Sequence, residues 1–253
     1  EKVLGVLPVI GGQSATSKSR ASREECRNRD LYIYEKPKSA TAEAARTLRT
    51  NLDFLASTRP LQSLLITSAV PQEGKSTISV NTSISFATGG RRVLLVEADL
   101  RRPRLATSFE VDSARGLSSY LAGVDTEPDD YFQSTVVENL DLLVAGPVPP
   151  NPAELLQTTR FDELLEKMKN RYEVIIFDSP PVLAVTDALI LARKVDGMLM
   201  VVRAEHTSRH TLRDGLRQLR AVQAPLAGIV LNHQRPLGRA YGYRGGRGYG
   251  YGY

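Results

Sequence analysis

The feature that most constrains this chain is a ten-residue segment that directly follows a short apolar run. Residues 63–67 (SLLIT) read as a buried strand, and residues 68–77 (SAVPQEGKST) then open a stretch of helical length. Strand, Gly–Lys–Ser loop and helix in this order form a phosphate-binding loop, whose backbone N–H groups surround phosphate oxygens. An ordinary strand-to-helix turn is the alternative, because Ala69 occupies the place of the usual first glycine.

Each residue of the loop has an expected part in binding ATP. Gly74 lets the backbone approach the phosphates, Lys75 reaches the terminal phosphates, and the Ser76 hydroxyl binds Mg²⁺. The residues expected to contact phosphate are Gln72, Glu73, Gly74, Lys75, Ser76 and Thr77. The loop thus predicts ATP and Mg²⁺ as cofactors.

Two further apolar runs end in acidic residues. Residues 93–99 (VLLVEAD) place Glu97 and Asp99 at the end of one run, and residues 174–178 (VIIFD) place Asp178 at the end of another. Ligands of open α/β sheets bind at the carboxyl ends of the strands, and Mg²⁺ prefers oxygen ligands. Taken singly, each acid is more often a helix N-cap. Beside Lys75 they favour a nucleotide site in which Ser76, Asp99 and Asp178 hold the metal.

The remaining sequence alternates apolar runs with segments of helical length. Further strands are expected at 3–10, 140–144, 198–202 and 226–231, and helices at 41–55, 75–88, 153–169, 186–194 and 207–222. Continuous Val/Ile/Leu strands that alternate with helices indicate a parallel sheet covered on both faces. We therefore expect an α/β P-loop NTPase fold over 41–232, preceded by an extension (1–40) that is a loop or linker over 11–40.

The C-terminal segment 233–253 is of low complexity and rich in tyrosine. Its last thirteen residues contain Tyr241, Tyr243, Tyr249, Tyr251 and Tyr253, half of the chain's ten tyrosines. Such Gly-rich sequence cannot bury enough surface to offset its ordering entropy, so we expect a flexible tail. A phospho-acceptor cluster is favoured over a segment that stacks on single-stranded nucleic acid, because residues 241–253 carry only two arginines. We expect no nucleic-acid partner, despite a net charge of +5.

These motifs resemble those of the bacterial tyrosine kinases (BY-kinases) of capsule and exopolysaccharide synthesis, relatives of the ParA/MinD ATPases. The resemblance covers residues 41–253 and rests on SAVPQEGKST, VLLVEADLRRP, VIIFDSPP, GPVPPNPAELL (146–156), EAARTLRTNL (43–52) and the tyrosine-rich end. It implies an ATP- and Mg²⁺-dependent autokinase that phosphorylates its own tail, in trans within a ring of identical subunits.

The resemblance also assigns a ring interface, partners and a location. Glu43, Arg46 and Arg49 would lie in the interface, on one side of a helix; a salt-bridged solvent face is the alternative. The implied partners are a transmembrane activator, in the same chain or separate, and a cognate tyrosine phosphatase. Because the chain starts at Glu1 and has no apolar run near the roughly 18–20 residues that span a bilayer, a missing upstream segment or a partner would hold it at the inner face of the membrane.

One position departs from the family pattern. Where the family has the first Asp of an Asp-x-Asp motif, this chain has Glu97. The resemblance assigns that residue to orienting or deprotonating the attacking tyrosine, whose ordinary pKa is near 10. The catalytic set is then Lys75, Glu97, Asp99 and Asp178. The alternatives are a ParA/MinD-like ATPase that acts as a positioning switch, and a nucleotide-sensing regulatory subunit in which Glu97 marks lost catalysis.

Two smaller clusters can each be interpreted as a functional site or as an ordinary surface feature. His206 and His210 have the i, i+4 spacing of a zinc pair but no third ligand, so a solvated helix face is favoured. Arg101, Arg102 and Arg104 follow the second acidic motif and could contact phosphates or a neighbouring subunit, or form a surface cluster.

Overall fold

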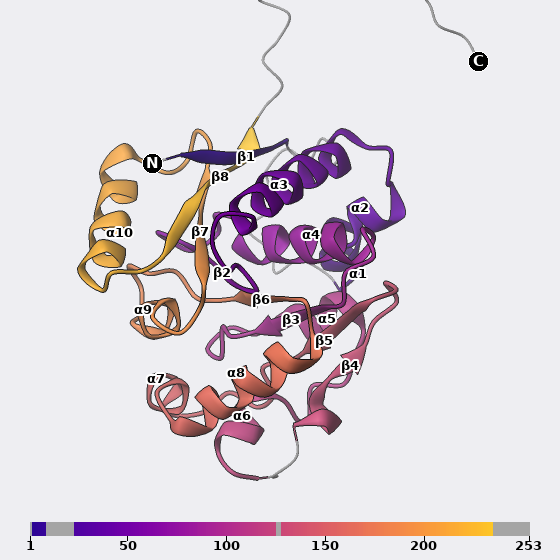
Figure 1. Ribbon diagram of the computed structural model, residues 1–253, viewed down its shortest axis with the longest axis vertical. Helices are drawn as coiled ribbons and strands as arrows, with labels where there is room; N and C mark the ends of the chain where they lie inside the picture. The colour runs from indigo at the N-terminus through magenta and orange to yellow at the C-terminus, as the bar shows by residue number, and fades with distance from the viewer. Residues whose placement is uncertain (1, 9–22, 125–127, 235–253) are drawn as a thin grey trace, which may run out of the picture.

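The protein, seen in a computed structural model that describes residues 2–8, 23–124 and 128–234, is a single sheet with helices on both faces (Figure 1). The strands are β1 (Val3–Pro8), β2 (Ser63–Ser68), β3 (Val93–Glu97), β4 (Gln133–Ser134), β5 (Leu140–Leu143), β6 (Val174–Asp178), β7 (Gly197–Arg203) and β8 (Leu226–Gln234). The helices are α1 (Arg23–Asp30), α2 (Tyr32–Glu35), α3 (Ala40–Ala56), α4 (Lys75–Ala87), α5 (Leu105–Phe109), α6 (Leu117–Leu121), the 3-10 turn η2 (Asp129–Tyr131), α7 (Pro152–Leu156), α8 (Thr159–Arg171), α9 (Asp187–Ala192) and α10 (Arg209–Ala221).

The strand order is β1-β8-β7-β2-β6-β3-β5-β4. Every neighbouring pair is parallel except β4 and β5, which are antiparallel. The predicted parallel-rich α/β fold is therefore confirmed. The central strands β2, β6 and β3 are buried along their whole length, which is why their sequences are continuous aliphatic runs rather than alternating ones.

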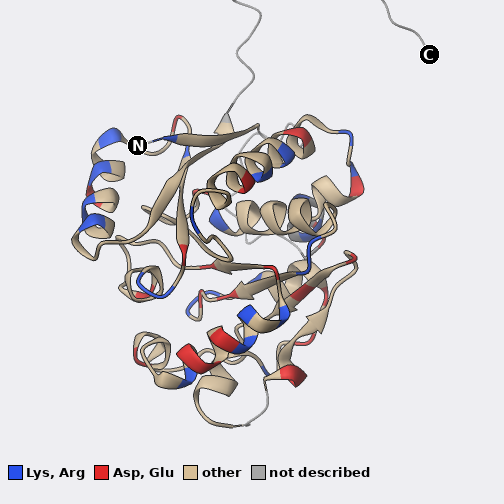
Figure 2. Cartoon of the chain, in the orientation of Figure 1, with Lys and Arg blue, Asp and Glu red and all other residues tan. Residues whose placement is uncertain are grey.

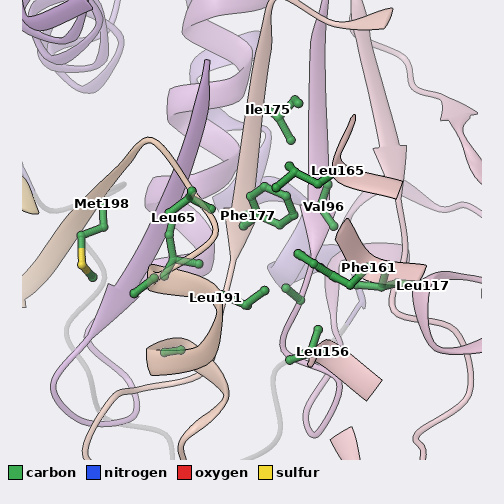
Figure 3. Close-up of a cluster of buried hydrophobic side chains, with 14 of the residues drawn as sticks. Leu65, Val96, Leu117, Leu156, Phe161, Leu165, Ile175, Phe177, Leu191 and Met198 are labelled. Carbon is green, nitrogen blue, oxygen red and sulfur yellow. The ribbon is translucent and has the colours of Figure 1, made fainter. Parts of the chain in front are cut away.

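The side chains of the central strands alternate between two hydrophobic cores. Leu65 and Val96 point into the core under α6 to α10, whereas Leu64, Ile66 and Leu95 point into the core under α2 to α5. Figure 3 shows part of the first core, where Phe161 from α8 lies near Phe177 from β6; their ring centroids are 6.0 Å apart. The two cores fix the register of the sheet, because a one-residue slip would exchange the sides.

Helix α4 continues from the P-loop and is buried although it is rich in Ser and Thr. Some of its hydroxyl groups donate to main-chain carbonyls one turn earlier: Ser79 to Lys75 at 2.9 Å and Ser83 to Ser79 at 2.8 Å. These local bonds satisfy Ser79 and Ser83 without solvent, whereas the buried polar side-chain atoms of Asn81 and Ser85 have no hydrogen-bond partner within the described part of the chain. The helix packs between the sheet and α3. Small side chains keep α4 close to the strands that carry the acids.

The N-terminal extension differs from expectation. The loop or linker predicted over 11–40 is wrong for residues 23–35, which form α1 and α2; residues 9–22 lie outside the described part of the chain. Strand β1 joins the sheet in parallel with β8 and is covered by α3, whose Asn51 Nδ2 donates to Leu4 O at 2.7 Å. The expected helix at 153–169 is two helices, because Thr158 has an extended backbone (φ −66°, ψ 153°).

The five tyrosines of the predicted acceptor cluster lie outside the described residues. What the structure does fix is the end of the strand that leads to them. Strand β8 runs to Gln234, beyond the predicted boundary at residue 233, and pairs with β7 in parallel. The last described residue, Gln234, therefore lies at the carboxyl edge of the sheet.

Candidate active site

The carboxyl ends of three neighbouring strands carry the predicted site. The P-loop follows β2, Glu97 ends β3 with Asp99 two residues later, and Asp178 ends β6. Glu97 and Asp178 face each other in the ladder, and the Ala98 amide donates to Asp178 O at 2.8 Å. Parallel pairing thus brings residues that are far apart in the sequence onto one edge of the sheet, where α/β sheets bind ligands.

The P-loop contains two residues with positive φ: Gln72 at 66° and Gly74 at 89°. Gly74 is the N-cap of α4, and its carbonyl accepts the first helical bond, from Ile78 N at 3.0 Å. A Cβ at Gly74 would lie 2.1 Å from Asn232 Nδ2. Two features therefore require glycine at position 74: the positive φ of the backbone and the close approach of the Asn232 side chain from β8.

The side chain of Glu73 fixes the loop from within the protein. Its carboxylate is fully buried; Oε2 accepts from Val70 N at 2.8 Å, and Oε1 accepts from the Thr207 hydroxyl. The Glu73 carbonyl accepts from Asn232 Nδ2 at 2.9 Å. Of the six residues expected at the phosphates, Glu73 can thus offer a phosphate only its backbone N–H, because its carboxylate is engaged elsewhere.

Lys75 extends toward the acids on the neighbouring strands. Its Nζ lies 3.0 Å from Asp99 Oδ2 and 3.5 Å from Ser76 Oγ. The other oxygen of Asp99 accepts from the Arg102 amide at 3.1 Å, and the residue is 5% exposed. Lysine, hydroxyl and carboxylate therefore meet at the open end of the P-loop.

Asp178 lies deeper, at 1% exposure. Its Oδ1 accepts from Ser79 Oγ at 3.1 Å. Burial raises the pKa of Asp178, against the lowering effect of the Lys75 charge and of a hydrogen bond from Ser76. A cation beside these oxygens would favour the ionised carboxylate, as at other carboxylate metal sites.

Glu97 has a different environment from the other two acids. It is 1% exposed; Oε1 accepts from the amides of Arg104 and Leu105, the latter at 2.6 Å, and Oε2 accepts from Ala145 N at 3.1 Å. Burial raises its pKa, and the three backbone hydrogen bonds lower it. The carboxylate thus holds the loop after β3 against the end of β5.

Two arginines of the cluster at 101–104 lie at the surface, with side chains 39% and 27% exposed, but each pairs with a buried carboxylate. Arg101 donates to both oxygens of Asp187 at 2.8 and 2.9 Å, and Arg104 to both oxygens of Asp30 at 2.6 and 3.2 Å. Both aspartates are fully buried. The loop that carries Asp99 is consequently anchored on two sides, on α9 and on α1.

The three residues of the expected interface helix do not behave alike. Arg46 pairs with Glu43 through Nε at 3.2 Å and also donates to Pro37 O at 2.9 Å; both side chains lie on the outside. Arg49 instead donates to Ser85 O at 2.5 Å, near the C-terminal end of α4. Glu43 and Arg46 face solvent, whereas Arg49 turns toward the body of the protein.

Both histidines are exposed, as the solvated-face interpretation expects, but only His210 lies on α10, and His206 lies in the turn before it. His210 Nδ1 lies 2.9 Å from Asp214 Oδ2 on the same helix. Across residues 2–8, 23–124 and 128–234, no group of three or more His, Cys, Asp or Glu side chains could hold a metal by itself. Figure 2 shows basic residues distributed over several elements, including α10, and interleaved with acids on α3 and α8.

Several residues that shape the site were missed from the sequence. Asn232 could have been found, since it lies at the carboxyl end of an expected strand. Asp30, Asp187 and Thr207 carry no such signal, because each acts through a contact with a distant segment.

A family model described as an AAA domain matches residues 72–229. Tyrosine-protein kinase YwqD of Bacillus subtilis is 38% identical over 232 residues, which cover 91% of this chain and 96% of YwqD. The chain also matches tyrosine-protein kinase etk of Escherichia coli, at 34% identity over 85% of this chain but only 29% of that longer protein.

Solved structures give the same picture. The chimerical protein CapA2B2 has a TM-score of 0.82 and 33% identity, covering 93% of this chain and 95% of that one. The kinase domain of Escherichia coli ETK has a TM-score of 0.82 and 31% identity, covering 100% and 95%. MinD from Pyrococcus horikoshii, with a TM-score of 0.58 and 24% identity over 70% of this chain and 74% of that one, shares the fold.

Replacing Gly74 with Ala tests the P-loop geometry. The added Cβ would clash with the Asn232 side chain, and the alanine would have to adopt a positive φ. Affinity for a fluorescent ADP analogue with Mg²⁺ should therefore fall at least about tenfold, or ~1.4 kcal/mol.

Gly90→Ala is the matched control: Gly90 has a φ of 86°, but no heavy atom lies within 4 Å of the place its Cβ would take. The control should keep nucleotide affinity and lose only about 1–2 kcal/mol of stability to backbone strain. Equal affinities in the two variants would contradict the geometry.

Glu97→Gln tests whether Glu97 holds the loop or acts as a base. An amide offers one acceptor oxygen instead of two, so at least one buried backbone N–H loses its partner, at a cost of about 1–3 kcal/mol in unfolding free energy. If Glu97 mainly holds the loop, stability and kcat fall together in urea unfolding and in kinase assays. A variant with wild-type stability and a large loss of kcat alone would favour the base.

Proposed function

This chain belongs to the bacterial protein-tyrosine kinases, and we propose that it transfers the γ-phosphoryl group of ATP to the tyrosine cluster at 241–253 of another copy of itself. The observation that carries the proposal is the meeting of Lys75, Ser76 and Asp99 at the open end of the P-loop, beside buried Asp178. In such a transfer the tyrosine oxygen forms a bond to the γ-phosphorus, the bond to ADP breaks, and the phenolic proton is released.

The residues at this edge fit ATP and Mg²⁺. The P-loop amides and the start of α4 suit phosphate oxygens, and Lys75 is the one basic residue of 68–77. Ser76, Asp99 and Asp178 offer oxygen ligands only, and two carboxylates with a hydroxyl match a Mg²⁺ that takes its other ligands from phosphates and water. When bound, Mg²⁺ would neutralise charge on the transferring phosphoryl group.

The protein's own groups then have distinct parts. Lys75 would move from Asp99 toward the β- and γ-phosphates, and its positive charge would stabilise charge that develops in transfer. Asp99 and Asp178 would hold the metal. Glu97, whose carboxylate accepts three backbone N–H groups, is proposed to keep the loop that carries Asp99 in place, in preference to the base role suggested by the family pattern.

Strand β8, which precedes the tail in the sequence, contacts the P-loop of this site. Asn232, which contacts Glu73 O, lies nine residues before Tyr241, the first tyrosine of the cluster. Nine extended residues span roughly 30 Å, so the cluster can reach its own site or that of a neighbour. We propose transfer in trans, within a ring in which the outer face of α3 meets the next subunit.

The wider setting is part of the same proposal. The kinase would regulate capsule or exopolysaccharide polymerisation and export, be activated at the inner face of the membrane, and be reset by a tyrosine phosphatase. Within the part of the chain that the structure describes, no helix combines the length and apolarity that crossing a bilayer requires.

Lys75→Met tests both chemistry and direction of transfer. Alone, the variant should give no phosphate-sized mass increments with Mg·ATP, because the phosphates lose the P-loop cation. Mixed with a partner that lacks residues 241–253, its intact tail should become phosphorylated, at a rate that rises with concentration, and phosphatase should remove the increments.

Self-modification by the variant would refute the assignment of Lys75 to the active site. Modification of wild type at a rate independent of dilution, with the variant unmodified in the mixture, would refute transfer in trans. ATP hydrolysis by wild type without any phosphotyrosine would support a ParA/MinD-like ATPase instead.

The ring is tested on the two outward-facing residues of α3. Glu43→Ala with Arg46→Ala should reduce the light-scattering mass of dephosphorylated protein toward that of a monomer, because charge pairs fix the register between subunits. Stability should change little, since both side chains lie outside. Arg49→Ala should instead lower stability, since it removes the donor to Ser85 O. An unchanged mass in the double variant would mean that another surface forms the ring.

A further inference from the structure

Asp30 is a fully buried carboxylate at the end of α1, in a segment that no part of the proposed chemistry uses. Helix α1 is almost entirely polar in sequence (REECRNRD) and packs against α5 and α4. A polar helix gains little from burial of apolar surface. Its position on the protein must therefore depend on specific polar contacts, and Asp30 makes several of them.

Both oxygens of Asp30 are fully engaged. Oδ2 accepts from Arg104 Nη1 at 2.6 Å and from Ser108 Oγ at 2.6 Å. Oδ1 accepts from Thr77 Oγ1 at 2.8 Å, from Arg104 Nη2 at 3.2 Å and from Arg29 Nε at 3.4 Å. Arg104 Nη2 also donates to Thr77 Oγ1 at 3.3 Å, which closes a triangle of side chains.

The two main partners of Asp30 belong to the two halves of the nucleotide site. Thr77 lies in the first turn of α4, two residues after Lys75. Arg104 ends the loop that carries Asp99, and its backbone N–H donates to Glu97. The Lys75–Asp99 pair joins these halves at the open end of the P-loop. Asp30 joins them a second time, deeper in the protein and from an element outside both.

The charge of Asp30 gives this link its strength. Burial raises its pKa, but the charge and hydrogen bonds of Arg104, with those of Arg29 and Ser108, outweigh burial and leave the pKa lowered. The carboxylate is therefore ionised at neutral pH. An ionised carboxylate placed in the interior is stable only while its cation and donors stay in place, so α1 and the Arg104 loop hold each other in position.

We propose that Asp30 is a positioning residue for the nucleotide site, so that docking of α1 and binding of Mg·nucleotide stabilise each other. The link rests on the proposed nucleotide site but does not require tyrosine transfer. Because thermodynamic coupling is reciprocal, nucleotide must strengthen α1 docking by the same factor by which docking strengthens nucleotide binding. Residues upstream of α1 thereby gain a route to the P-loop that needs no contact with ATP.

Asp30→Asn, which keeps the shape and removes the charge, is the primary test. The dissociation constant of a fluorescent ADP analogue with Mg²⁺ should rise about tenfold, as expected for couplings of typical size. The KM for ATP should rise in parallel, with a smaller change in kcat, because Asp30 touches neither substrate nor metal. Asp196→Asn is the matched control. Asp196 accepts from Ser63 N, Ser63 Oγ and Lys169 Nζ at 2.8, 2.7 and 3.1 Å, but at the opposite edge of the sheet.

Hydrogen exchange distinguishes coupling from a purely structural role. If Asp30 only stabilised the fold, binding of Mg·ADP would not change amide exchange in α1. In wild type, Mg·ADP should slow amide exchange in α1 as well as in the P-loop. In Asp30→Asn, Mg·ADP at saturating concentration should still protect the P-loop but no longer α1. Ser108→Ala, which removes one donor to Asp30, should give a smaller effect in the same direction and serves if Asp30→Asn does not fold.

The outcomes separate the two proposals. Wild-type affinity in Asp30→Asn, an equal loss in Asp196→Asn, or protection of the P-loop without protection of α1 in wild type would each overturn the coupling. If Asp30→Asn does not fold, wild-type affinity in Ser108→Ala overturns it as well. Wild-type protein that binds no nucleotide would instead overturn the proposed function itself.

Discussion

Parallel pairing of β2, β6 and β3 is the constraint on which the rest of the molecule depends. Because the three strands run in the same direction, their carboxyl ends meet at one edge, and the P-loop, Asp178 and Asp99 meet there too. Antiparallel pairing would place one of these groups at the far edge of the sheet. The two hydrophobic cores keep this register, so packing far from the nucleotide loop maintains the geometry of the site.

The same convergence concentrates negative charge in a buried place. Glu97, Asp99 and Asp178 are each at most 5% exposed, and carboxylates out of water are costly unless hydrogen bonds or cations stabilise them. Each acid is stabilised by a different kind of group. Glu97 accepts hydrogen bonds from backbone amides, Asp99 pairs with Lys75, and Asp178 accepts hydrogen bonds from serine hydroxyls. Only Asp99 and Asp178 are stabilised by groups that a nucleotide and a metal could replace. This difference separates the acids of the proposed chemistry from the acid that holds the loop.

The sequence predicts the features of this structure that depend on local patterns, and it does not predict those that depend on contacts between distant segments. The strands other than the two-residue β4, the P-loop and the acids were predictable because each is a local pattern: an aliphatic run, a loop of fixed spacing, a carboxylate at a strand end. Helix α1 was not predictable, since REECRNRD has no apolar period and is held by the contacts of Asp30 with Thr77, Arg104 and Ser108. Arg49 shows the same limit: its spacing placed it with Arg46, but the nearby end of α4 turned it inward. Local pattern fixes elements, and distant polar partners decide the direction of long side chains.

Strand β8 contacts the nucleotide loop and precedes the proposed acceptor segment in the sequence. Asn232 Nδ2 bonds Glu73 O in the P-loop, and the same approach requires glycine at 74. Two residues later β8 ends at Gln234, so the last described residue of the strand follows closely on its contact with the P-loop. Contour length therefore sets no barrier to transfer within one subunit. Because reach alone permits both, the proposed transfer in trans depends on how neighbouring subunits are placed around the site. In the proposed ring, oligomer geometry rather than reach would then select which tail is modified.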